Sequence, residues 1–122
     1  MAKPKKISYY RKKADKLLQE VGRLKHDFCM VCGGEYNCLH HYWPKSSSSA
    51  LRYDWENLIP ICIGCHAKHH WGNPDIHNIV NKVHGLGWIR KLREKKEKII
   101  KSNKGYYLQA IEELENERAK YS

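Results

Sequence analysis

Two Cys-x-x-Cys pairs constrain this chain more than any other feature of its sequence: Cys29 with Cys32, and Cys62 with Cys65. Each pair can bind Zn²⁺ from a tight turn, and two pairs complete a closed tetrahedral site. Such pairing is typical of a metal site and is hard to explain by four independent buried cysteines. The sequence therefore predicts a structural Zn²⁺ ion. Cys38, the fifth cysteine, has no partner at ligand spacing and is expected to be a small buried residue.

Positive charge is the second constraint. The 122 residues include 23 Lys and Arg against 13 Asp and Glu, which gives a formal net charge of +10. This length predicts one domain with a small core that a metal site would help to stabilise. The charge is concentrated in residues 1–27 and 88–104, each with a net charge of +6, around a nearly neutral centre. This distribution favours nucleic acid as the partner over a uniformly solvated basic surface.

Hydropathy and the first residues predict a location inside the cell. No stretch approaches the eighteen or more apolar residues of a membrane span, so no membrane partner is expected. The start, "MAKPKKISYY", has basic residues without the apolar segment of a secretory signal. We therefore expect a cytoplasmic protein (in the host cell, if phage-encoded) whose thiols stay reduced.

Apolar spacing predicts a basic helix before the cysteines. After a disordered basic tail at residues 1–7, apolar residues recur at helical spacing to about residue 25, with Ser8 as the expected N-cap. We assign this helix to a segment of residues 8–27. The opposite face is basic and includes Arg11, Lys12 and Lys13.

The central segment, residues 28–72, reads as two short strands and a helix. We expect strands at residues 38–43 and 57–61, a loop between them, and a helix that begins between Cys62 and Cys65 and ends near Trp71. The four serines of the loop, residues 46–49, are expected to be a flexible connection. Trp43, Trp55 and Trp71 are expected to pack around the core rather than stack on bases.

Residues 73–122 read as a helical extension. Asn73 is expected to cap a helix that starts at Pro74 and ends near His84. A second helix, marked by Trp88, Ile89, Leu92, Ile99 and Ile100, is expected to end near "SNKG". A last helix carries the stripe Tyr107, Ile111, Leu114 and Tyr121. This stripe could bury a homodimer face or dock on the first helix.

Histidines cluster around the second strand–helix unit. His66 and His70 are four residues apart on one helical face and can bind one metal ion together. His40 and His41 are neighbours on a strand and point to opposite sides, so one can face such a metal while the other faces substrate. Asn57, at the start of the second strand, could hold the loop through its side-chain amide. Each of these residues taken alone would more often be a packing or turn residue.

Together these residues resemble the HNH nuclease family, which has a ββα-metal fold. His41, Asn57 and His66 lie within "HHYWP" and "NLIPICIGCH", and the paired cysteines match the zinc-stapled members of the family. The match covers residues 28–71. Outside it, "LRYDWEN" and "WGNPDIHNIVNKVHGLGWIRKL" resemble the phage NinG/Rap recombination proteins, which are nucleases acting on branched DNA.

The resemblance implies a small α+β fold: a ββα-metal (HNH) core with structural zinc, flanked by N- and C-terminal basic α-helices. It implies hydrolysis of DNA phosphodiester bonds to 5′-phosphate and 3′-hydroxyl ends. His41 would be the general base, and Asn57 would position its loop. His40, His66 and His70 would bind a catalytic divalent ion, with His69 the less favoured third ligand. Imidazole ligands suit Zn²⁺, Ni²⁺ or Mn²⁺ better than Mg²⁺.

Cations near these motifs are candidate DNA contacts. Lys45, Arg52 and Lys68 lie close to the motif and could hold the scissile phosphate or be solvated surface charges. The basic helices add further candidates: Arg11, Lys12, Lys13, Arg90, Lys91 and Arg93. Branched or junction DNA is the substrate that the NinG/Rap resemblance implies. The alternatives are a nicking, homing-type or restriction HNH nuclease, or a non-catalytic zinc-ribbon module that binds nucleic acid.

Overall fold

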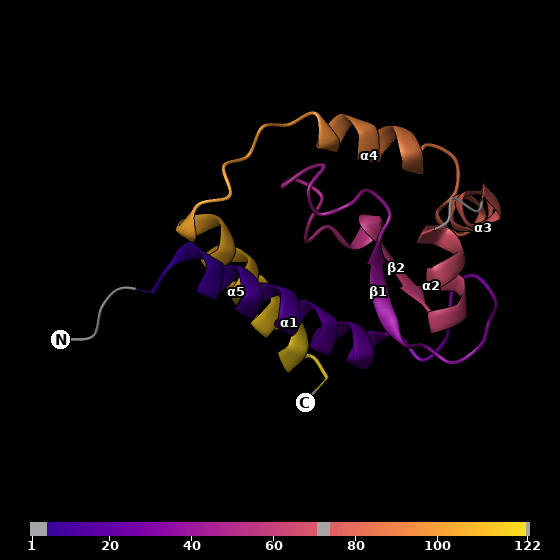
Figure 1. Cartoon of the computed structure of the whole chain (residues 1–122), viewed down its shortest axis with the longest axis horizontal. Coiled ribbons are helices and arrows are strands. Elements are labelled where there is room, and N and C mark those ends of the chain that lie inside the picture. Colours follow the sequence, from indigo (N-terminus) through magenta and orange to yellow (C-terminus); the bar gives the residue numbers. More distant parts are fainter. Residues whose placement is uncertain (1–4, 71–73, 122) are drawn as a thin grey trace.

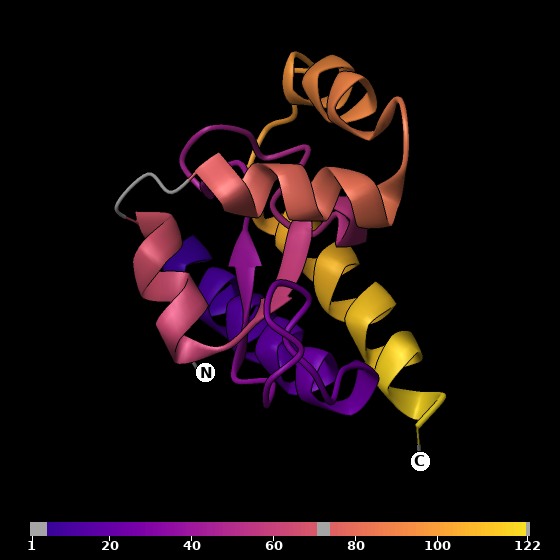
Figure 2. The ribbon, with the colours of Figure 1, turned by 90° about the vertical axis from the view of Figure 1, so that its right-hand side faces the viewer.

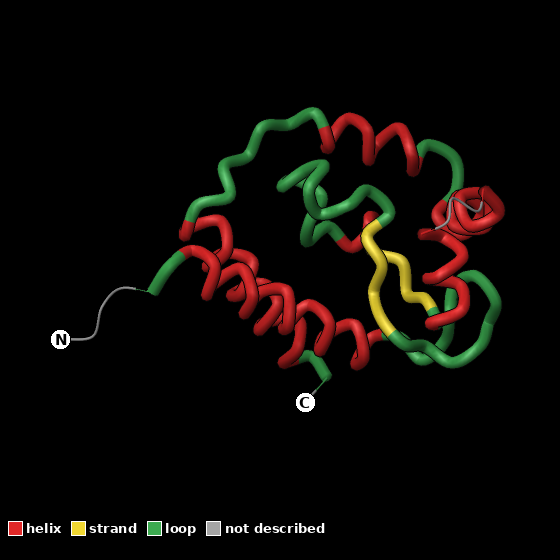
Figure 3. Tube along the Cα trace, in the orientation of Figure 1, coloured by secondary structure: helices red, strands yellow, loops and turns green. Residues whose placement is uncertain are grey.

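The computed structural model describes residues 5–70 and 74–121, without the side chains of residues 69, 70, 74 and 75. Within these ranges the chain forms five α-helices, one short 3-10 helix (η1) and two strands (Figures 1 and 3). In chain order they are α1 (Ile7–Lys25), β1 (Cys38–His41), η1 (Trp55–Asn57), β2 (Leu58–Ile61), α2 (Ile63–His70), α3 (Pro74–His84), α4 (Trp88–Lys96) and α5 (Lys104–Ala119). The prediction of a small α+β fold is confirmed. None of the helices in the described ranges is long and apolar enough to cross a membrane.

The first and last helices form a parallel pair (Figure 1). The Lys104 ammonium lies 5.2 Å from the Tyr10 ring centroid near the start of both helices, and Lys25 pairs with Glu117 at 3.2 Å near their ends. Apolar side chains at helical spacing bury this contact. The first core cluster comprises Ala14, Leu17, Leu18, Val21, Leu39, Leu58, Tyr107, Ala110, Ile111 and Leu114. Tyr107, Ile111 and Leu114 of the C-terminal stripe therefore dock on the first helix.

A two-stranded antiparallel sheet separates this core from a second one. Leu39 lies opposite Pro60 and His40 lies opposite Ile59. Because side chains alternate along a strand, Leu39 and Leu58 join the first core, whereas Ile59 and Ile61 join the second. The second core also contains Cys29, Leu51, Cys65, Ile76, Val80, Trp88 and Leu92. Helix α3 supplies Ile76 and Val80 and lies across the sheet in Figure 2.

Three details of the predicted helices are wrong. Ser8 lies inside α1, which begins at Ile7 after Lys6, so Ser8 is not the N-cap. Helix α4 ends at Lys96 instead of near "SNKG", and Ile99 is 97% exposed. Tyr121 is also exposed and lies beyond the end of α5. Ile99 and Tyr121 continue an apolar pattern, but neither joins a core cluster of the described residues.

Strand and helix boundaries in the centre differ slightly from expectation. Strand β1 ends at His41 instead of residue 43, and Asn57 belongs to η1 rather than to β2. Helix α3 begins at Pro74 as predicted, because proline needs no partner for its missing N–H at the first helical position. The expected cap Asn73 and Trp71 lie outside the described residues.

Candidate functional site

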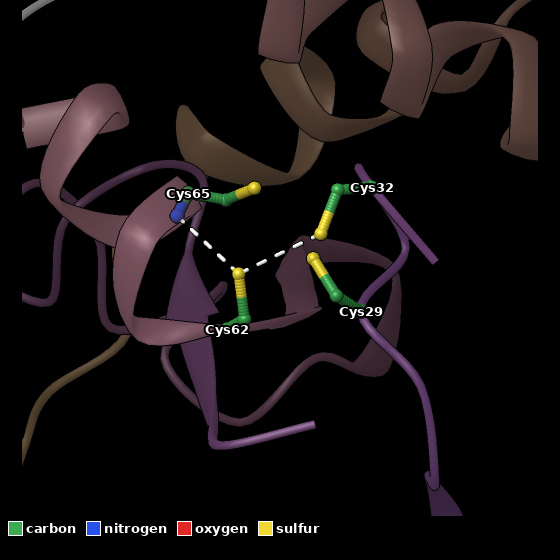
Figure 4. A group of neighbouring side chains, drawn as sticks. All are labelled: Cys29, Cys32, Cys62 and Cys65. Atoms are coloured by element: carbon green, nitrogen blue, oxygen red, sulfur yellow. Dashed lines mark hydrogen bonds between the residues drawn. The ribbon is translucent and has the colours of Figure 1, made fainter. Parts of the chain in front are cut away.

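Four cysteine thiols meet at the start of α2 (Figure 4). The sulfur atoms of Cys29, Cys32, Cys62 and Cys65 all lie within 4.8 Å of one another, and those of Cys32 and Cys62 are 3.7 Å apart. Sulfurs bound at about 2.3 Å to one tetrahedral Zn²⁺ would be about 3.8 Å apart. The four cysteines therefore fit a structural metal ion such as zinc.

Local backbone geometry aims these thiols at a common point. Gly33 has φ +75°, a conformation that favours glycine, and its N–H donates to the Cys29 carbonyl at 3.0 Å to close the turn. At the other pair, the backbone N–H of Cys65 donates to Cys62 Sγ at 3.4 Å. This hydrogen bond is the main reason that the pKa of Cys62 is lowered to about 7. A lowered thiol pKa favours the thiolate form that binds metal.

A second group of residues surrounds a cavity of about 560 Å³ that follows β1. Its wall includes His40 and His41 from the strand, His66 from α2, and Lys45 from the following loop. The ring centroids of His40, from β1, and His66, from α2, are 4.7 Å apart. The structure thus brings together the first two predicted ligands of the catalytic ion. His70 belongs to α2, but its side chain and that of His69 lie outside the described part of the chain.

Cys38 lies beside this histidine pair rather than in the four-cysteine cluster. Its Sγ is 3.9 Å from His66 Nδ1. Burial raises the pKa of the Cys38 thiol, so the protonated form predominates near neutral pH. The sequence predicts a buried Cys38; in the structure it is half-buried and packs against the second core.

His41 faces the opposite side of β1 and is only 7% exposed. Its Nε2 is 2.9 Å from the carbonyl oxygen of Arg52. Because a carbonyl only accepts hydrogen bonds, Nε2 carries the hydrogen, and Nδ1 is the atom of the neutral ring that can accept a proton. Burial is the main reason that the pKa of His41 is lowered. The neutral imidazole is therefore the predominant form near pH 7.

Asn57 holds the loop that follows His41. Its side chain is fully buried and its Oδ1 accepts from the backbone N–H of Trp43 at 2.9 Å. Its Nδ2 donates to the carbonyls of Trp43 at 3.1 Å and Leu51 at 3.2 Å. These three hydrogen bonds join both ends of the serine loop, defined here as residues 44–52. Asn57 thus holds this loop through its side-chain amide.

A contact that the sequence did not reveal links α1 to His41. The Asp15 carboxylate accepts from Arg52 at 2.6 and 3.2 Å and from the Tyr53 hydroxyl at 2.8 Å. Burial raises the pKa of Asp15, but the hydrogen bonds from Arg52 and Tyr53 outweigh it and hold that pKa below its usual value. Because the Arg52 carbonyl also accepts from His41, Asp15 helps to fix the orientation of the imidazole. No local sequence pattern predicts a pairing across 37 residues.

The cations predicted to contact DNA fall into two groups. Most are exposed: Lys45, Lys68, Arg11, Lys12, Lys13, Arg90, Lys91 and Arg93. Arg52 differs, because its guanidinium is engaged by Asp15 and its side chain is only 14% exposed. The geometry therefore gives Arg52 a structural role beside His41, and Lys45 is the exposed cation on the wall of the same cavity.

The chain is similar to part of one curated protein, the mitochondrial DNA mismatch repair protein mutS homologue of Sarcophyton glaucum. The two sequences are 36% identical over 74 residues, which cover 57% of this chain. The chain spans only 7% of the length of that relative. No protein-family model and no solved structure matches this chain.

Proposed function

We propose that this protein is a metal-dependent DNA endonuclease of the HNH type. The observation that carries the proposal is the arrangement around the β1 cavity. A buried neutral His41 with an oriented ring lines the same cavity as a His40–His66 pair. A module that only binds nucleic acid has no need for a buried histidine whose tautomer is fixed by a backbone carbonyl.

In the proposed reaction His41 is the general base. Nδ1 takes a proton from a water molecule, and the resulting hydroxide forms a bond to phosphorus. The bond between phosphorus and the 3′-oxygen breaks, and that oxygen takes a proton from solvent water. The products are 5′-phosphate and 3′-hydroxyl ends. The Arg52 carbonyl stabilises the imidazolium through the Nε2–H bond, and Asn57 keeps the loop that carries Arg52 in place. Lys45, an exposed cation that lines the same cavity, would neutralise charge on the phosphate.

The His40–His66 pair fits a divalent ion in its donor chemistry. Two imidazoles from different elements, with ring centroids 4.7 Å apart, reach the same cavity. Such a pair would hold the ion, with His70 as the proposed third ligand, and the bound ion would supply Lewis-acid stabilisation of the negative charge that develops on the phosphate. The nitrogen ligands favour Mn²⁺, Ni²⁺ or Zn²⁺ over Mg²⁺.

The surface and the relative support DNA as the substrate. The relative is named as a DNA mismatch repair protein. Helices α1 and α4 lie on two sides of the central unit in Figure 1, and both helices carry exposed cations that would bind phosphates without sequence preference. More specifically, we propose that the substrate is branched DNA and that the protein acts in phage recombination. Symmetric cutting of a junction would need two active sites, and hence a dimer formed by a surface other than the buried stripe of α5.

Cleavage of plasmid DNA and of a synthetic four-way junction with Mg²⁺, Mn²⁺ or Ni²⁺ tests the proposal. His41→Ala should lower the cleavage rate by about 10²–10⁴-fold, the usual contribution of a general base. The matched control is His26→Ala, which changes a half-buried histidine that does not line the cavity and should leave the rate unchanged.

The outcomes separate the competing functions. Undiminished cleavage by His41→Ala would remove His41 as the base. DNA binding by the wild type without cleavage under any ion would favour the zinc-ribbon binding module. Preferential, symmetric cutting of the junction would support the branched-DNA form of the proposal, and equal cutting of junction and linear duplex would contradict it.

A further inference from the structure

A second cavity lies between the serine loop and the segment that joins α4 to α5. Its volume is about 340 Å³. Its wall contains all four serines of the run at residues 46–49, together with the cations Lys45, Lys96 and Lys98. Figure 3 shows both segments as loops without regular structure. Hydroxyl and ammonium groups are the donors that bind phosphate oxygens, so the lining favours an oxyanion over an apolar ligand.

The two walls of this cavity are tied together. The Ser49 hydroxyl donates to the carbonyl of Ile100, and the Tyr106 hydroxyl of α5 donates to the Ser49 carbonyl. At the end of α4, Lys95 pairs with the Asp54 carboxylate at 2.7 Å. These contacts fix the serine run against the α4–α5 segment. The run is therefore part of a built cavity and not the free connection that its composition predicts.

Ser48 is the residue of this cavity whose hydrogen bonding indicates that a ligand binds there. It is 8% exposed, and its hydroxyl is buried without a hydrogen-bond partner among the residues that the structure describes. A buried hydroxyl without a partner costs roughly as much free energy as a lost hydrogen bond, so such groups are uncommon in folded proteins. A bound phosphate oxygen would accept from this hydroxyl.

The charges around Ser48 are arranged for an anion. Lys96 lies over the Trp43 ring, 4.4 Å from the centroid, which holds the side chain near the cavity. Lys45 and Lys98 are exposed, and the carboxylate of Glu97 also lines the wall. Arg52 is already neutralised by Asp15. Three lysines against one glutamate leave the cavity positive.

Lys45 lines both this cavity and the β1 cavity that contains His41. We propose that the second cavity is a phosphate subsite, which binds a DNA backbone phosphate other than the scissile one through Ser48, Lys96 and Lys98. The proposal rests on the proposed function for its choice of DNA. The subsite would set the register of the strand so that the neighbouring phosphodiester reaches His41.

Binding of a fluorescent DNA duplex, measured by anisotropy without added divalent ions, tests the subsite. All variants are made in the His41→Ala background, so that cleavage does not interfere. Ser48→Ala should weaken binding about tenfold, because it removes one hydrogen bond to a charged group. Its thermal unfolding midpoint should not fall, because the hydroxyl has no described partner to lose.

A second set of measurements uses lysine variants and modified DNA to test the same subsite. Lys98→Ala should reduce the slope of log K against log salt by about 0.9, the value for one released phosphate contact. Lys82→Ala, an exposed lysine of α3 outside the cavity, should leave the slope unchanged. In a third measurement, a neutral methylphosphonate replaces one phosphate of the strand at a time. It should weaken DNA binding by the wild type at one position besides the scissile phosphate. Replacement at that position should not weaken DNA binding by Ser48→Ala.

The subsite proposal would be overturned if Ser48→Ala bound the DNA duplex with wild-type affinity and a methylphosphonate weakened its binding at the same position as in the wild type. The same substitution, Ser48→Ala, is also made with His41 intact. Cleavage by that variant at the wild-type rate and position, together with the unchanged affinity, would leave the nuclease intact and remove only the subsite. If the binding results are as expected but the wild-type protein cleaves no DNA with any ion, the phosphate subsite is supported and the nuclease proposal is contradicted.

Discussion

At the residue scale, Asn57 is the side chain on which the geometry around His41 depends most directly. A fully buried amide must satisfy its polar groups within the protein, and Asn57 does so with backbone groups of Trp43 and Leu51. No other side-chain type offers a donor and an acceptor in the same short amide. The loop conformation therefore follows from this one residue.

Asn57→Ala should destabilise the protein by at least about 2 kcal/mol, because it leaves buried backbone groups of the loop without partners. The measurement is the free energy of unfolding by urea. The control Asn78→Ala changes an exposed asparagine of α3 and should shift stability by no more than about 0.5 kcal/mol. Equal effects of the two substitutions would contradict the role given to Asn57.

Several residue placements could be predicted from the sequence because they follow from a regular spacing of residues along the chain. His40 and His41 face opposite sides because a strand alternates, and the Cys-x-x-Cys spacing brings its thiols together in a turn. The Asp15–Arg52 pair could not be predicted, since a contact between distant segments depends on the packed fold. The burial of Ser48 was missed for the same reason.

At the element scale, Gly22 sets the distance between α1 and β1. A Cβ atom at this position would lie 2.7 Å from Cγ and Cδ1 of Leu39 and 2.6 Å from the Tyr36 hydroxyl. Leu39 is buried in the first core and cannot move away easily. The absence of a side chain therefore lets the helix approach the strand that carries the histidines.

Gly22→Ala should destabilise the protein by about 1 kcal/mol. Alanine favours the helix over glycine by about 1 kcal/mol. The cost of overpacking against Leu39 and Tyr36, about 1–3 kcal/mol, outweighs that gain. Gly64→Ala in α2 is the matched control. Its Cβ would meet no atom within 4 Å, so the substitution should stabilise the protein slightly. Thermal unfolding of both variants checks the opposite signs, and a stabilised Gly22→Ala would show that α1 can move.

Element ends were predicted less well than element types. The apolar residues Ile99 and Ile100 extend the pattern of α4, yet the helix ends at Lys96. The chain then runs extended toward the serine loop, where Ile100 accepts a hydrogen bond from Ser49. A tertiary contact thus decides where the helix stops, and a periodic pattern carries no information about that contact.

At the scale of the whole molecule, the two cores depend on metal to different extents. The second core contains Cys29 and Cys65 themselves, together with side chains of α3 and α4. The first core is formed by α1, α5 and the sheet and contains no metal ligand. Loss of the structural ion should therefore act on one half of the molecule first.

Removal of zinc with a chelator should lower the unfolding temperature and abolish amide-exchange protection in α3 and α4 before α1 and α5. Hydrogen exchange with mass spectrometry gives this order. Cys62→Ser should lose the bound metal, whereas Cys38→Ser should retain it, because Cys38 lies outside the four-cysteine cluster. Simultaneous loss of protection in all helices would show that the two cores unfold as one unit.

The short sheet would be a hazard if its edges were open, since unpaired strand edges recruit other chains into aggregates. Both edges are closed by groups from elsewhere in the chain. The Gln19 amide accepts from the N–H of Leu39 at 3.0 Å and donates to its carbonyl at 3.2 Å, as a neighbouring strand would. On the other edge, Met30 N–H donates to the carbonyl of Pro60 at 2.9 Å, and proline offers no donor there. Within the part of the chain that the structure describes, Leu39 and Pro60 at the two edges of the sheet are thus already hydrogen-bonded, and neither position is left to pair with a strand of a second copy.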